Sequence, residues 1–122
     1  SINMLKMGAD LYIKEMPREA QYRGFELSEE AVDAGYFRDC YNDSGLFQNM
    51  GLSWWRTFTQ YRLDKTDGEM TPEQAEAFKE EVQKAWEKCP VKDDKEYQEW
   101  YELLIRFLDT AIKSKSNIIF SV

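Results

Sequence analysis

The sequence contains no histidine among its 122 residues. Histidine is the usual general base near neutral pH, it activates serine and cysteine nucleophiles, and it is a ligand in the common zinc sites. Its absence excludes the catalytic triads and zinc sites that depend on it. Carboxylate catalysis stays open, because several acids could converge in a cleft. We expect a non-catalytic protein that uses neither a metal ion nor a cofactor.

Long apolar runs are also missing, and no basic stretch precedes a short apolar one as in a signal peptide. A membrane span needs about 18 apolar residues in a row. We therefore expect a soluble, cytoplasmic protein. The two cysteines, Cys40 and Cys89, are far apart in the sequence. In a reducing compartment both are expected to be buried thiols that folding does not require.

The charge of the chain is acidic and unevenly distributed. The formal net charge is −7, and residues 67–109 hold thirteen acids against six bases, which accounts for all of it. An acidic surface repels nucleic acids and anionic membranes but attracts basic proteins and cationic ligands. We therefore expect no nucleic-acid or membrane partner and favour a basic protein partner. The same acids would also suit the solvent-exposed faces of two helices.

Strands are expected at the two ends of the chain. Apolar and polar residues alternate over residues 9–16, which predicts a half-buried strand that Pro17 ends. Residues 118–122 form a second apolar stretch, so we expect the two ends to pair in one small sheet. Residues 1–8 are expected to be a flexible lead-in and residues 18–27 a loop. Without repeats or long linkers, residues 1–122 should form a single domain.

Capping residues mark the starts of three short helices and two long ones. The short helices are expected over residues 29–34 after Ser28, over residues 46–50, and over residues 54–61 after Ser53.

The long helices begin with capping boxes, one formed by Thr71 and Gln74 and one by Asp93 and Glu96. They should end near residues 88 and 113. The second has a wide apolar face and is expected to be largely buried between the sheet and the preceding helix. The predicted fold class is α+β, a mostly helical single domain with a small sheet formed by the N- and C-terminal strands.

The turn before the first long helix resembles the middle of a calcium-binding EF-hand loop around Gly68. In that alignment Leu63, Lys65 and Gln74 stand where oxygen ligands are needed. We therefore predict a turn without calcium.

Residues 36–56, YFRDCYNDSGLFQNMGLSWWR, hold six aromatic residues interleaved with polar ones. Two interpretations stay open. The rings form a core layer whose polar members satisfy loop backbone, which we prefer, or they line a pocket. Residues 36–41 are read as extended rather than helical. The candidate ligand- or partner-binding residues are Arg38, Asp39, Tyr41, Asn42, Asp43, Trp54, Trp55 and Arg56.

Within this segment the polar side chains and the tryptophans are expected to have different roles. We expect Trp54 and Trp55 mainly to hold the fold, because truncating a buried tryptophan costs about 3–5 kcal/mol. The polar members are expected to bind the partner and to tolerate substitution without loss of stability; they are chiefly Arg38, Asp39, Asn42 and Asp43.

The stretches MGADLYI, YFRDCYN and GLSWW, followed by a long helix and a short terminal strand, resemble a family of small uncharacterised bacterial proteins. The resemblance covers most of the chain. It implies a bacterial or phage origin, and it brings neither an activity nor site residues.

The sequence favours a small non-catalytic binding protein with a basic protein partner, such as an accessory, immunity or counter-defence protein. One alternative is a protein that binds a cationic or aromatic small molecule in an aromatic pocket. Another is a carboxylate-dependent hydrolase. Self-association into a homo-oligomer is left open.

Overall fold

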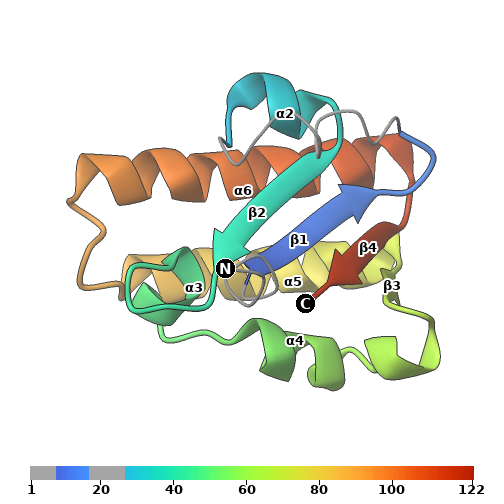
Figure 1. Ribbon diagram of the computed structural model, residues 1–122, viewed down its shortest axis with the longest axis horizontal. Helices are drawn as coiled ribbons and strands as arrows, with labels where there is room; N and C mark the ends of the chain where they lie inside the picture. Colours follow the sequence, from blue (N-terminus) through green and yellow to red (C-terminus); the bar gives the residue numbers. More distant parts are fainter. Residues whose placement is uncertain (1–7, 17–26) are drawn as a thin grey trace, which may run out of the picture.

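Four antiparallel strands form one sheet in the computed structural model, which describes residues 8–16 and 27–122 (Figure 1). The strands are β1 (Gly8–Ile13), β2 (Tyr36–Cys40), β3 (Glu69–Met70) and β4 (Ile118–Ser121), in the order β2-β1-β4-β3. Leu11 of β1 lies opposite Phe37 on one side and opposite Phe120 on the other. The predicted pairing of the two ends of the chain is confirmed.

The alternation of side chains gives the sheet one buried face. Ala9, Leu11 and Ile13 of β1 are buried, and Asp10 and Tyr12 point to the other face. The extended reading of residues 36–41 is confirmed over β2. The flexible lead-in predicted for residues 1–8 is one residue too long, because Gly8 already pairs with Cys40 of β2. The rest of the lead-in and nearly all of the predicted loop at 18–27 lie outside the described residues.

The helices lie on and around this sheet (Figure 1). They are α2 (Glu29–Asp33), α3 (Leu46–Asn49), α4 (Trp54–Gln60), α5 (Pro72–Glu87) and α6 (Lys95–Ser114), with a 3₁₀ turn, η2 (Leu63–Lys65). The two long helices pack against each other behind the sheet in this view, and α2 packs on α6. The short α4 lies at the opposite edge of the molecule from α2. Within the described ranges, no helix has both the length and the apolar character for crossing a membrane.

The helix starts follow the predicted caps with two exceptions, α3 and α6. No side chain of the turn at 42–45 caps α3, whose N-cap residue is Gly45. Ser28 and Ser53 accept hydrogen bonds from backbone amides of the first turns of α2 and α4, and both bonds of the Thr71 capping box are present. The cap of α6 was predicted one residue too early. Asp94, not Asp93, accepts from the amides of the first turn, because only a side chain at the N-cap position reaches them.

Aromatic rings fill the space between the sheet and the helices. Phe47 stacks on Trp54 with ring centroids 3.6 Å apart, and Phe78 meets Trp54 edge-on. All of these rings belong to one hydrophobic core that includes residues of β1, β2 and β4. Both cysteines are free thiols; Cys89 is buried as predicted, whereas Cys40 is only half-buried.

The expected burial of α6 is confirmed on one side only. Leu104, Phe107, Leu108 and Ala111 are buried in the core. Leu103 and Ile105, which widen the apolar face, pack against the edge of the core and remain half-buried. This incompletely covered side borders a groove.

Candidate functional site

Asp39 of β2 is a buried carboxylate, only 1% exposed, at the centre of a hydrogen-bond network. Its Oδ1 atom accepts from the backbone amides of Cys40 at 2.8 Å and Leu46 at 2.9 Å. Its Oδ2 atom accepts from the amide of Phe47 at 2.9 Å and from the indole Nε1 of Trp54 at 2.7 Å. The carboxylate therefore joins β2, the start of α3 and the central tryptophan.

All four groups around Asp39 are donors, so none of them can accept a proton from a neutral carboxyl. Burial raises the pKa of Asp39, and the hydrogen bonds oppose that rise because they favour the carboxylate. The expectation that Asp39 lies at the surface is wrong, because its side chain is buried. Its substitution is therefore expected to lower stability. This residue is inaccessible and organises the fold.

The two tryptophans of the segment have opposite environments. Trp54 is 1% exposed and lies in the core, as predicted, whereas Trp55 is 60% exposed. The Trp55 ring stacks on Phe58 of the same helix with ring centroids 5.5 Å apart and an interplanar angle of 7°. The prediction that Trp55 mainly holds the fold is wrong, because the helical period turns it outward when Trp54 turns inward.

Asn42 and Asp43 form the turn between β2 and α3. The Asn42 side-chain oxygen accepts from the amide of Ser44 at 2.9 Å, which is the local bond typical of an Asx turn. Asp43 is exposed, and its backbone oxygen accepts from the side-chain amide of Asn49 at 2.8 Å. The contacts of both residues therefore build the loop.

Arg38 and Tyr41 belong to the outer face of the sheet and the turn beside it. The Arg38 guanidinium lies over Gly8 and forms an ion pair with Asp10 at 3.9 Å, and the Tyr36 hydroxyl donates to Asp10 at 2.6 Å. Burial, the hydrogen bond to Asp10 and its charge raise the pKa of Tyr36. Burial and nearby carboxylate charges raise the pKa of Tyr41 to about 12. Both phenols are therefore neutral at pH 7 and do not act as bases there.

The outward face of α4 carries Arg56 beside the exposed Trp55. Arg62 follows the helix and is also exposed. Neither arginine forms an ion pair with any residue of the described ranges. Of the eight predicted site residues, only Trp55 and Arg56 together present accessible side chains on one helix. The structure thus splits the predicted site into an outer-face cluster, a core network with its turn, and the face of α4.

A groove of about 920 Å³ lies elsewhere, between α2 and α6. It combines apolar side chains with an excess of acids. Its lining residues are Leu27, Ser28, Glu29, Asp33, Glu99, Glu102, Leu103, Ile105, Arg106, Asp109, Thr110 and Lys113. Among them five carboxylates face two bases, so the groove is acidic.

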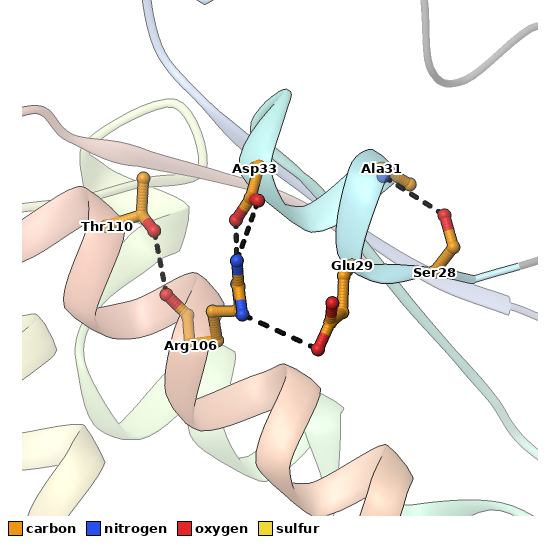
Figure 2. A network of polar contacts seen from close by, with 6 residues as sticks. All are labelled: Ser28, Glu29, Ala31, Asp33, Arg106 and Thr110. Carbon is orange, nitrogen blue, oxygen red and sulfur yellow. Dashed lines mark hydrogen bonds and ion pairs between the residues drawn. The ribbon is translucent and has the colours of Figure 1, made fainter.

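Arg106 on α6 joins the two helices that border the groove (Figure 2). Its Nε and Nη2 atoms donate to the two carboxylate oxygens of Asp33 at 2.7 and 2.8 Å, and Nη1 lies 3.5 Å from Glu29. This bidentate geometry is the strong form of an arginine–carboxylate pair. The hydrogen bond from Arg106 lowers the pKa of Asp33. Arg106 therefore links α2 to α6 at one side of the groove, and its guanidinium group is already paired with carboxylates of α2.

The remaining acids differ in whether they have a partner. Asp109 pairs with Lys79 of α5 at 2.5 Å. Glu99 and Glu102 are exposed and form no ion pair with any residue that the structure describes. Their spacing of three places them on one face of α6, one turn apart. They supply the negative charge that is free to meet a ligand.

None of the groove residues was identified as a site in the sequence analysis. Asp33 and Arg106 are 73 residues apart, and nothing in either local pattern indicates that they meet. The available signal was the wide apolar face of α6 beside the acids at positions 99 and 102. That pattern predicted burial because an apolar face usually packs against the body of the domain.

Comparisons with known proteins give no relative for this chain. No family model, curated protein or solved structure matches it. The resemblance to small bacterial proteins stays a prediction.

Proposed function

We propose that this chain is a non-catalytic interaction protein that binds a basic segment of a protein partner in the acidic groove between α2 and α6. The groove itself carries the proposal, because five carboxylates and two bases line it together with the apolar side chains of Leu27, Leu103 and Ile105. Acidic and apolar groups in one concave surface suit a segment that carries lysine or arginine beside apolar residues.

Each part of the groove has a distinct task in this proposal. The free carboxylates of Glu99 and Glu102 pair with cationic side chains of the partner and steer its approach. The half-buried Leu103 and Ile105 lose their remaining contact with water when the partner covers them. Arg106 stays bound to Asp33 and keeps the wall in place. Binding of this kind would serve an accessory, immunity or counter-defence role.

The small-molecule alternative is less well supported. It requires the rings of residues 36–56 to line a pocket, and the stacked pair of Phe47 and Trp54 instead lies in the core. The described groove lies between α2 and α6, away from these rings.

A labelled amphipathic peptide of alternating lysine and leucine blocks tests the proposal by fluorescence anisotropy. A peptide with glutamate in place of lysine is the probe control. In Glu99→Gln/Glu102→Gln, affinity for the lysine peptide should fall roughly 5–30-fold, since two partly exposed ion pairs are worth about 1–2 kcal/mol together.

The matched control is Glu76→Gln/Glu80→Gln, which removes the same charge from two exposed positions of α5 outside the groove. Its affinity should stay within about twofold of wild type. Equal weakening in both double variants would show attraction to the net charge alone and overturn the proposal. Failure of the wild type to bind the lysine peptide would do the same.

A further inference from the structure

The outward face of α4 has the chemistry that the groove is proposed to bind. Trp55 is 60% exposed and stacked on Phe58, so a flat apolar surface faces solvent. Arg56 lies next to it, and Arg62 follows within two turns. Both guanidinium groups lack an ion pair among the described residues. Trp and Arg are the side chains that most often anchor protein interfaces.

Arg56 and Arg62 give this face positive charge in a chain whose net charge is −7. Glu81 of α5 also reaches the end of α4, where it accepts hydrogen bonds from Gln60 and Tyr61. Residues 55–65 hold three bases, Arg56, Arg62 and Lys65, against one acid, Asp64, which pairs with Lys65 at 3.9 Å. Two exposed arginines, Arg56 beside the ring and Arg62 just after the helix, therefore form no ion pair with any described residue. The face of α4 and the groove are opposite in charge, and each has an apolar part.

We propose that the occupant of the groove is the α4 face of a second copy of this chain, an inference that rests on the proposed function. Trp55 of one copy covers Leu103 and Ile105 of the next, and Arg56 meets Glu99 and Glu102. A copy cannot fill its own groove, because α4 and α2 lie at opposite edges of the molecule (Figure 1).

The contact joins two different surfaces, so copies associate head to tail. Each added copy leaves one groove and one α4 face free, and growth stops only if a ring closes. A single tryptophan anchor with a few ion pairs makes a small interface, which gives weak, concentration-dependent association. The ion pairs lie at the surface, so added salt should weaken it.

Two variants with neutral replacements test the pairing by sedimentation equilibrium from micromolar to millimolar protein. Trp55→Ser/Arg56→Gln removes the contact residues of the α4 face and leaves the groove intact. Glu99→Gln/Glu102→Gln removes the free carboxylates of the groove and leaves the α4 face intact. Neutral residues are used because charge reversal on both surfaces would create a new attraction. All four positions are exposed, so both variants should fold, and thermal melts of each variant are the check.

The wild type should increase in average mass with concentration, and each variant alone should stay monomeric at the concentrations where the wild type begins to associate. An equimolar mixture of the two variants should form a one-to-one dimer and nothing larger, because only one intact face and one intact groove are present in each pair. Glu76→Gln/Glu80→Gln should associate like the wild type.

A monomeric wild type at millimolar concentration, or a variant mixture that stays monomeric while the wild type associates, overturns the inference. If the wild type is monomeric and the groove still binds the lysine peptide, the inference fails and the proposed function stands. If the peptide fails as well, both are wrong.

Discussion

Replacing Asp39 with asparagine should destabilise the protein strongly while leaving its shape almost unchanged. The carboxylate accepts hydrogen bonds from four donors, two on each oxygen. Asparagine keeps one acceptor oxygen and turns an NH₂ group toward the other two donors. Two buried donors then lack an acceptor, at a cost of about 1–3 kcal/mol each, or about 2–6 kcal/mol in total.

That loss is a large share of the roughly 5–15 kcal/mol that stabilises a domain. At this chain length a loss of 1 kcal/mol lowers the melting temperature by roughly 3–5 °C, so a drop of about 6 °C or more is expected. Urea unfolding followed by tryptophan fluorescence measures the free energy directly. The matched control is Asp43→Asn, an exposed position where the same change should cost less than about 0.5 kcal/mol.

A double-mutant cycle identifies the cause. Trp54→Phe removes one donor, so its cost should be smaller in the Asp39→Asn background than in the wild type. If Asp39→Asn unfolds within about 0.5 kcal/mol of Asp43→Asn, the network does not stabilise the fold and the reasoning above is refuted.

Three further predictions concern the core, the α2–α6 contact and the turn at Gly68. Trp54→Ala should lose about 3–5 kcal/mol in urea unfolding and Trp55→Ala less than about 1 kcal/mol; similar losses would contradict their assigned environments. The pKa of Asp33 is lowered from its ordinary value of 3.8, so its pairing stabilises the fold above that pH and is lost as pH falls through the folded pKa. Between about pH 5 and about pH 3 the free energy of unfolding should therefore fall less for Asp33→Asn than for the wild type, by under about 1 kcal/mol. An equal fall in the two proteins would count against the pair. Millimolar calcium should leave the melting temperature unchanged, and a saturable rise would show that the turn at Gly68 binds it.

Local signals predicted the elements well, because they depend on neighbouring residues. Ser28, Ser53 and Thr71 start helices where their side chains reach nearby amides, and the alternation around Leu11 predicted β1. The two-residue strand β3 was not predicted, since its pairing with β4 depends on a residue almost fifty positions away.

The candidate sites were harder to predict because accessibility is set by the tertiary fold. Asp39 and Asp43 look alike in sequence, and one is enclosed by four donors while the other faces water. Adjacent tryptophans at 54 and 55 differ only in the side of α4 on which they lie. The groove forms only when Asp33 and Arg106 meet, which neither local pattern indicates.

The order of the strands also constrains how the chain can fold during synthesis. β1 is a central strand, and one of its two edges pairs through four residue positions with β4, more than a hundred residues later. While the ribosome has not yet released residues 118–121, that edge exposes unpaired amides and carbonyls, and the core lacks Ile118 and Phe120. The nascent chain thus holds an incomplete sheet until almost its last described residues emerge. The core can close only after residues 118–121 have left the ribosome, and a chain truncated before residue 118 should be a substrate for chaperones and proteases rather than a smaller stable domain.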